Sequence, residues 1–130
     1  MMRHAIDTPL APAAIGIYSQ AVQAGGMVYL SGQIGIDPMT GQLVEGGEAQ
    51  IEQVFANLAA VAKAAESSLD QAVKFTLYLT DLAHFPKVND VMARVLKQPW
   101  PARAVVGVAS LPRGALIEAD AILWKNCWPS

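Results

Sequence analysis

Residues 48–80, EAQIEQVFANLAAVAKAAESSLDQAVKFTLYLT, contain a helical repeat followed by a strand repeat. In the first part, apolar residues recur every three or four positions, which is the spacing of one buried helix face. Those residues are Ile51, Val54, Phe55, Leu58, Val61, Ala62 and Ala65. In the second part every second residue is apolar, as in a half-buried strand. Those residues are Val73, Phe75, Leu77 and Leu79. The stretch therefore predicts an amphipathic helix over 48–66 and a strand over 72–80.

On the N-terminal side, an irregular start and then a hairpin around Gly25 and Gly26 are predicted, because two glycines between apolar runs are typical of a tight turn. The second run, residues 27–34, predicts a strand with two faces. One face carries Val28, Leu30, Gly32 and Ile34, and the other carries Met27, Tyr29, Ser31 and Gln33. Residues 37–41, DPMTG, predict a turn, because proline fixes φ and glycine accepts a positive φ.

On the C-terminal side, a second helix is predicted to begin near Phe85 and Pro86, since proline is tolerated in a first turn. Its buried residues would be Phe85, Val88, Met92 and Val95. Two strand-like runs follow, over 102–109 and 116–124, and the LPRG sequence at 111–114 joins them as a hairpin. The expected fold class is therefore α+β, a mixed sheet with two helices packed on one face.

The composition indicates one domain, residues 1–130, with more apolar surface than such a domain usually buries. Of the 130 residues, 53% are hydrophobic and only 15% are charged, where about a quarter is usual. The sheet face without helices would carry large side chains, and that mixture suits packing against another subunit. These side chains are Met27, Tyr29, Tyr78, Leu116, Ile122 and Trp124. An ordinary apolar monomer is the alternative.

Charge and motif content argue against several classes of protein. The formal net charge of −2 and the absence of any Lys or Arg run argue against a nucleic-acid partner. No secretory signal and no membrane span is visible, so we expect a cytoplasmic protein without a membrane partner. Cys127 is the only cysteine, which argues against an internal disulfide and against a thiolate metal site.

Two charged residues stand out because they interrupt apolar strands. Arg103 lies in an otherwise uncharged run and needs an anion, either a protein carboxylate or the carboxylate of a small ligand. Glu118 would pair with Arg103 or hold a water molecule. In a symmetric hairpin Arg103 would face Ile122 and Glu118 would face Gly107, which separates the two charges by roughly 13 Å. A substrate could span part of that gap, or Glu118 of a neighbouring chain could face Arg103.

From about Ile15 to Ile122 the sequence resembles the Rid/YjgF family of enamine and imine deaminases, formerly the endoribonuclease L-PSP family. Each matching segment is weak alone, but their shared order and spacing are specific for the family. The segments are GIYSQA (16–21), YLSGQIG (29–35), DPMTG (37–41), Val88-Asn89, PARA (101–104) and Ile117-Glu118.

The resemblance implies a chorismate-mutase-like fold that assembles as a homotrimer with pockets between subunits. It implies hydrolysis of small 2-imino acids such as 2-aminoacrylate or 2-iminopropanoate to 2-oxo acids and ammonia, without a metal or organic cofactor. By matched position, Arg103 would hold the substrate carboxylate and Glu118 would orient or deprotonate the attacking water. The residues implied to line the pocket are Tyr18, Ser31, Gly32, Asn89 and Val105, with Gly32 and Val105 acting through their backbones.

Three departures from the family pattern affect what can be carried over. Ile17 replaces the proline that commonly precedes the tyrosine, so the loop that presents Tyr18 has more conformational freedom. Gly107 stands where many relatives carry a larger polar residue, and Val105 where several carry cysteine. Rival functions are a non-catalytic trimer that binds small carboxylates in a regulatory or chaperone-like role, and a ribonuclease activity, which the acidic pI disfavours.

Overall fold

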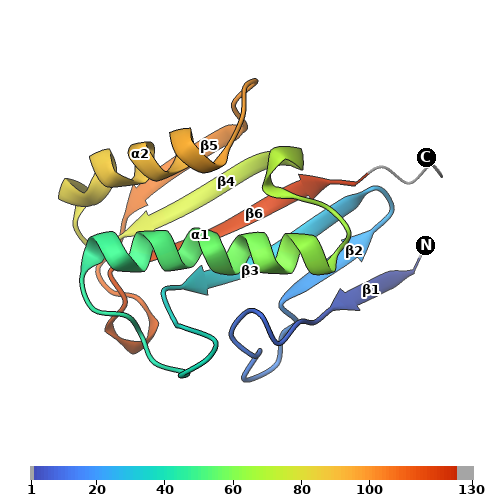
Figure 1. Cartoon of the computed structure of the whole chain (residues 1–130), viewed down its shortest axis with the longest axis horizontal. Helices are drawn as coiled ribbons and strands as arrows, with labels where there is room; N and C mark the ends of the chain where they lie inside the picture. Colours follow the sequence, from blue (N-terminus) through green and yellow to red (C-terminus); the bar gives the residue numbers. More distant parts are fainter. Residues whose placement is uncertain (1, 126–130) are drawn as a thin grey trace.

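The computed structural model describes residues 2–125, which form one six-stranded sheet with two α-helices on the same face (Figure 1). The strand order is β1-β2-β3-β6-β4-β5, so the last strand in sequence lies inside the sheet. Among the described strands, only β4 and β5 pair in parallel. The elements are β1 Arg3–Ile6, β2 Ala21–Ala24, β3 Met27–Ile34, α1 Gly47–Ala64, β4 Ala72–Leu79, α2 Phe85–Val95, β5 Ala102–Gly107 and β6 Ile117–Trp124. Three short 3₁₀ helices, at Leu69–Gln71, Leu82–His84 and Pro112–Gly114, complete the described chain. The α+β class and the two helices are confirmed.

The core lies between α1 and the sheet, as the repeat in residues 48–80 predicts. All seven residues predicted for the inner helix face are buried. The rings of Phe55 on α1 and Phe75 on β4 meet with centroids 5.8 Å apart, a favourable separation for two aromatic rings. The second helix begins at Phe85 with Pro86 in its first turn, and it buries Val88 and Met92 as predicted. Phe85 and Val95, also predicted to be buried, are only partly buried.

The N-terminal hairpin is confirmed, but the segment before it is not irregular. Ala24 pairs with Met27 across Gly25 and Gly26, and Gly25 has a φ of +60°. Residues 3–6 form β1, which pairs antiparallel with β2 at the sheet edge. The sequence RHAI has no clear alternation, and all of its residues except the half-buried Ile6 are exposed. An edge strand held mainly by backbone pairing gives little hydrophobic pattern to detect.

The predicted hairpin between the last two strands is wrong. Strand β5 pairs in parallel with β4, where Arg103 lies beside Phe75, while β6 inserts between β3 and β4. Arg103 therefore does not face Ile122, and Glu118 pairs with Tyr78 rather than Gly107. The connection through α2 makes β4 and β5 parallel, and the 3₁₀ turn at Pro112–Gly114 carries the chain past β4 to the middle of the sheet.

Two irregularities change which face a residue occupies. The pairing of β3 with β6 shifts register between Leu30 and Gln33, so Gln33 is buried while Gly32 is exposed. The strict alternation predicted for residues 27–34 therefore fails after Leu30. A second shift, between Ala72 and Lys74, leaves Val73 43% exposed instead of buried. One extra residue in one strand of a pair is enough to reverse the faces beyond it.

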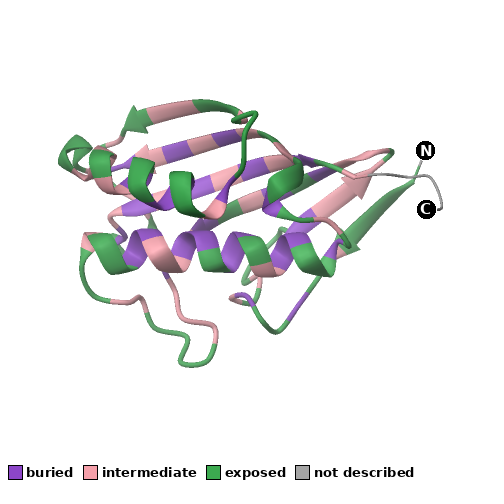
Figure 2. Cartoon of the chain, turned by 45° about the horizontal axis from the view of Figure 1, so that its top comes forward, coloured by how far each residue is buried: buried purple, intermediate pink, exposed green. Residues whose placement is uncertain are grey.

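The sheet face opposite the helices is only partly covered within one chain. On that face Tyr29 and Trp124 are 47% and 46% exposed, and Ile122 is half-buried. The burial colours in Figure 2 alternate along the central strands, because one face of each strand packs under the helices while the other does not. This agrees with the predicted mixture of large side chains on the uncovered face.

Candidate functional site

Arg103 extends from β5 toward α2, on the helix-covered side of the sheet. Its Nη1 donates a hydrogen bond to Asn89 Oδ1 at 2.6 Å and contacts Met92 Sδ at 3.7 Å. The Cζ atom lies 5.1 Å from the centroid of the Phe85 ring, within the range of a cation–π contact. Within residues 2–125 no carboxylate forms an ion pair with Arg103. The guanidinium is oriented by neutral groups, and its charge is not balanced by an acidic side chain of the described chain.

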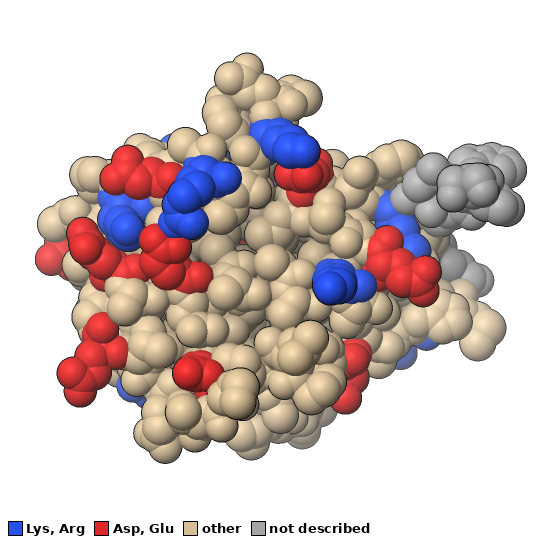
Figure 3. Space-filling model, in the orientation of Figure 1, with Lys and Arg blue, Asp and Glu red and all other residues tan. Residues whose placement is uncertain are grey.

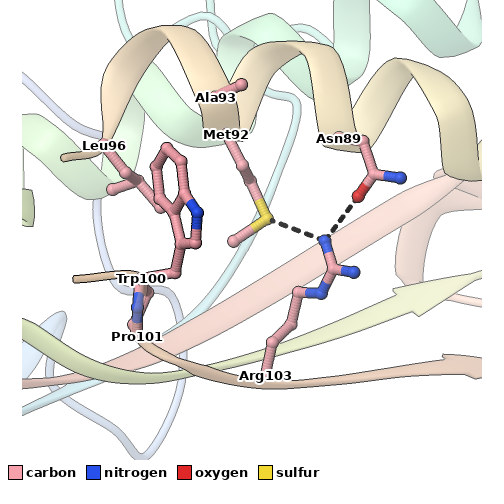
Figure 4. A pocket seen from close by; sticks show the side chains of 7 residues that line it. All are labelled: Asn89, Met92, Ala93, Leu96, Trp100, Pro101 and Arg103. Atoms are coloured by element: carbon pink, nitrogen blue, oxygen red, sulfur yellow. Dashed lines mark hydrogen bonds between the residues drawn. The ribbon is translucent and has the colours of Figure 1, made fainter. Parts of the chain in front are cut away.

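A pocket of about 410 Å³ opens beside this guanidinium (Figure 4). Its walls come from α2 and from the residues that lead into β5. Asn89 and Arg103 form a polar end, and Trp100 and Leu96 form an apolar end. In the close-up the Met92 side chain stands between the two ends. The arrangement can take an anion at one end and apolar carbon atoms at the other.

Glu118 lies in a different place, on β6 and on the uncovered face of the sheet. Together with Tyr18, Gly32 and Arg113 it lines a pocket of about 490 Å³. Burial raises the pKa of the Glu118 carboxyl, and the negative charge of nearby Asp120 raises it further. A half-buried carboxyl with a raised pKa is suited to accept a proton from water near neutral pH.

The register shift in β3 brings Gly32 against Glu118. A Cβ atom at position 32 would lie 2.9 Å from Glu118 Cδ and would overlap the carboxylate oxygen. Only glycine leaves room for this carboxylate. The neighbouring Ser31 uses its hydroxyl to donate to Ser19 O at 2.6 Å. Ser31 therefore joins two chain segments next to the pocket, and the residues that line the pocket do not include it.

Tyr18 is presented by an exposed loop. The preceding Gly16 has a φ of +126°, Ile17 is fully exposed and Tyr18 is 53% exposed. The Ile15 N–H donates weakly to Tyr18 Oη at 3.4 Å. Replacement of the expected proline by Ile17 therefore leaves an apolar side chain in solvent in the single chain.

The buried amide of Gln20, to which the sequence analysis gave no role, supports this loop. Gln20 Oε1 accepts from Thr8 N at 2.7 Å, and Nε2 donates to Pro12 O at 2.8 Å and to Thr8 O at 3.1 Å. The side chain is only 1% exposed. A buried amide that replaces missing strand hydrogen bonds fixes the backbone beside the site. Gln20 belongs to the GIYSQA segment, but the sequence gives no signal of this contact, because its partners are backbone atoms 8 to 12 residues away.

Two further residues missed by the sequence analysis adjoin Glu118. Asp120 follows it on the same face of β6, and Tyr78 on β4 donates from its hydroxyl to Asp120 Oδ2 at 3.0 Å. Burial raises the pKa of Tyr78, and the hydrogen bond to Asp120 raises it further. The period-two pattern of 117–124 placed Asp120 beside Glu118 on one face, which was the available signal.

The seven predicted site residues thus fall into separate groups within one chain. Arg103 and Asn89 meet at the edge of the sheet, and Val105 lies on the same side, partly buried beside Leu77. Tyr18, Gly32 and Glu118 meet on the other face. From about 3.3 Å per residue and about 4.8 Å between strands, the Cα atoms of Arg103 and Glu118 lie roughly 14 Å apart. Because their side chains leave opposite faces of the sheet, one chain does not bring them together.

The described residues contain neither a helix that could span a membrane nor a cluster of metal-ligating side chains. No helix in residues 2–125 is long and apolar enough to cross a membrane. In the same part of the chain, no three His, Cys, Asp or Glu side chains gather as metal ligands would. Cys127 lies outside the described residues. His84, beside the predicted helix start, immediately precedes α2.

Comparison with known proteins gives consistent matches over nearly the whole chain. The family model described as "Endoribonuclease L-PSP" matches residues 8–124. A protein of Dermatophagoides farinae named 2-iminobutanoate/2-iminopropanoate deaminase is 44% identical, covering 91% of this chain and 93% of that protein. The crystal structure of RidA from an Antarctic Psychrobacter species is 51% identical with a TM-score of 0.91, covering 93% and 98% of the two chains. Escherichia coli TdcF with bound serine is 35% identical with a TM-score of 0.89, covering 95% and 99%.

Proposed function

This chain belongs to the Rid/YjgF (endoribonuclease L-PSP) family, and from that premise we propose that it is a hydrolytic deaminase of small 2-imino acids. The products are the 2-oxo acid and ammonia. The observation that carries the proposal is Arg103, a cation without an acidic partner in the described chain, next to an open pocket. Relatives with 44% to 45% identity that bear the name 2-iminobutanoate/2-iminopropanoate deaminase support the same reaction.

In the proposed reaction Arg103 binds the substrate carboxylate. A planar guanidinium donates two parallel hydrogen bonds to a carboxylate, which fixes the orientation of the neighbouring imine carbon. Asn89 holds one guanidinium nitrogen in place, and the Phe85 ring lies under the cation. Serine, the ligand in the TdcF structure, also carries a carboxylate next to an amine-bearing carbon.

We assign to Glu118 the activation of the attacking water molecule. The water oxygen bonds to the imine carbon while Glu118 takes one of the water protons, and a carbinolamine forms. The Glu118 proton then returns to the nitrogen. The carbon–nitrogen bond breaks as the hydroxyl oxygen forms the carbonyl and gives its proton back to Glu118, and the 2-oxo acid and ammonia leave. The raised pKa of Glu118 favours this two-way transfer near neutral pH. A protonated imine is already electrophilic, so the site needs no covalent nucleophile.

The two groups act together only if two copies of the chain contribute to one pocket, as in a homotrimer. Arg103 lies on the edge strand β5, and Glu118 lies on the uncovered sheet face. The exposed Tyr29 and Trp124 on that face supply apolar surface for a second copy. In a closed ring each pocket takes Arg103 from one copy and Glu118 from the next. Tyr18 and Gly32 then come from the same copy as Glu118.

A ribonuclease function is less well supported, although the family's name refers to one. On the face in Figure 3, Lys and Arg side chains lie close to Asp and Glu side chains, and much of the surface carries neither. The formal net charge is −2. Affinity for RNA depends mainly on neutralising phosphates with clustered basic residues. The charge pattern therefore favours a small anionic substrate.

The direct test is ammonia release from freshly generated 2-iminopropanoate, by wild type and by Arg103→Ala. We expect turnover by wild type and a loss of at least about 100-fold in kcat/KM for the variant, because the substrate carboxylate loses its charged partner. Arg103→Lys keeps the charge but loses the two-pronged contact, so it is expected to fall between them. Wild type that binds pyruvate without releasing ammonia would instead identify a non-catalytic carboxylate-binding protein.

A mixing experiment tests the shared pocket. Arg103→Ala and Glu118→Gln chains are each expected to be inactive when assembled alone. Unfolding and refolding them together at equal amounts is expected to restore about a quarter of wild-type activity, because about a quarter of the pockets combine an intact Arg103 with an intact Glu118. A pocket built within one chain would give no restored activity, since every chain carries one defect.

A further inference from the structure

The pocket beside Arg103 continues beyond the space that a carboxylate and an imine carbon require. Asn89 at the polar end and Leu96 at the apolar end are seven residues apart on or just beyond α2. At 1.5 Å per residue this separation is about 10 Å. On the opposite wall, Trp100 and Arg103 are three residues apart along the chain that enters β5. The pocket is therefore elongated, with one charged end.

The apolar end is built from side chains that differ in exposure. Leu96 and Met92 are 5% and 7% exposed and form the base. Trp100 is 53% exposed and stands beside Leu96 in Figure 4. An indole ring that covers apolar side chains on one side and faces an open pocket on the other still has apolar surface to bury. The pocket volume of about 410 Å³ lies within the range of small-molecule sites.

We propose that Met92, Leu96 and Trp100 form a side-chain subsite, which selects 2-imino acids with an apolar side chain of about four carbons, the size of leucine's, over the alanine-sized substrate. The inference rests on the proposed role of Arg103 as carboxylate anchor. The carboxylate fixes one end of the ligand at the guanidinium, and the side chain extends along Met92 toward Trp100. The flexible thioether of Met92 adapts to branched chains.

The size of the expected preference follows from the burial of carbon atoms. Each buried methylene strengthens binding by about fourfold. A ligand with three more carbon atoms than the small reference gains at most about 60-fold if all three are buried. Because Trp100 is half exposed and the pocket is open on one side, we expect about 10-fold.

The test measures binding of two unreactive acids, propanoate and 4-methylpentanoate, by NMR titration of the assembled protein. We expect 4-methylpentanoate to bind wild type about 10-fold more tightly, and Trp100→Ala to reduce that ratio to about 2. Trp100→Phe, which keeps a ring, is expected to retain most of the ratio. Met39→Ala, which removes a 91% exposed side chain from a remote turn, serves as the control and leaves the ratio unchanged.

Several outcomes would overturn the subsite. Equal binding of the two acids to wild type, or a ratio that survives Trp100→Ala, would show that the ligand chain does not reach the indole. A parallel loss of both affinities together with a changed oligomeric state would assign Trp100 to a subunit contact instead. Because binding is measured without turnover, a protein that shows the preference but releases no ammonia would refute the proposed function and leave the subsite standing.

Discussion

Gly32 and Glu118 are packed so closely that no side chain fits between the backbone of β3 and the carboxylate. Gly32→Ala is therefore expected to displace Glu118 from its position in the pocket. The displaced carboxylate no longer contacts the attacking water. We therefore expect kcat/KM for imine hydrolysis to fall by roughly 100-fold, the usual scale of losing a general base. Thermal unfolding followed beside the kinetics separates this effect from a loss of fold.

Gly46→Ala is the matched control for that substitution. Gly46 has a φ of +92° and no atom within 4 Å of an added Cβ, so alanine there strains the backbone without touching the site. We expect it to lower stability by about 1–3 kcal/mol while kcat/KM stays near wild type. If Gly32→Ala lost no more activity than Gly46→Ala, the close contact would have no catalytic role.

Much of the fold could be predicted because its main elements carry strong periodic patterns. The helix face from Ile51 to Ala65 and the alternation from Phe75 to Leu79 are both found as expected. The partner of β5 could not be predicted from sequence order, because β5 pairs with β4, on the other side of α2 in the chain, and not with the next strand. Strand β1 was missed because its stability comes from backbone pairing with β2.

The candidate site residues could be named from the sequence, but their arrangement in space could not. Arg103 and Glu118 stand out as charges in apolar strands, and Asn89 entered through the family motifs. The opposite directions of Arg103 and Glu118 depend on strand register, which a sequence pattern does not specify across non-adjacent strands. Tertiary contacts such as Gln20 to Thr8 leave no periodic signal.

The pKa of Glu118 predicts how its replacement affects stability at different pH values. A raised pKa means that the folded protein favours the protonated carboxyl, so this contribution to stability is complete below about pH 4.5 and is lost as pH rises through the folded-state pKa. Glu118→Gln stays neutral at every pH. We expect Glu118→Gln to unfold at a higher temperature than wild type at pH 7, with the difference shrinking toward pH 4.

A wild-type protein that is more stable than Glu118→Gln at pH 7, and loses that advantage in acid, would place a favourable cation next to Glu118. Arg113 is the one Lys or Arg residue among the described residues that line the same pocket. Repeating the melts with Arg113→Gln identifies whether it is responsible.

Asp120 predicts a shift in the pH dependence of catalysis. Its negative charge adds to the effect of burial in raising the pKa of Glu118, which must be ionised to accept a proton from water. Asp120→Asn removes the charge, so the acid limb of the kcat/KM profile is expected to move to lower pH. Tyr78→Phe removes only the hydrogen bond to Asp120 and is expected to leave that limb nearly in place. Identical profiles for wild type and Asp120→Asn would exclude an electrostatic role for Asp120.

The buried amide of Gln20 predicts a stability loss centred on the loop that carries Tyr18. Gln20→Ala leaves the Thr8 N–H and the Pro12 carbonyl without their partners. Leaving buried polar groups unpaired costs roughly 1–3 kcal/mol, which urea unfolding measures directly. Gln42→Ala, at an exposed position, is the control and is expected to change stability by less than about 0.5 kcal/mol. Equal effects of the two substitutions would mean that water replaces the Gln20 contacts.

The two helices are joined by an ion pair whose effect should depend on acid and salt. Glu52 on α1 accepts hydrogen bonds from Arg94 on α2, and Lys87 Nζ lies 3.2 Å from the same carboxylate. The Arg94 hydrogen bond lowers the pKa of Glu52, so this contribution to stability is present above about pH 4.5 and is lost as pH falls through the lower folded-state pKa.

Because the side chains are partly exposed, Glu52→Gln is expected to cost only about 0.2–1 kcal/mol at pH 7. The cost should shrink in 1 M salt and below pH 4, whereas Glu45→Gln, an exposed acid outside this network, should show neither change. A cost that persists in acid would assign the role of Glu52 to packing of its methylene groups between the helices.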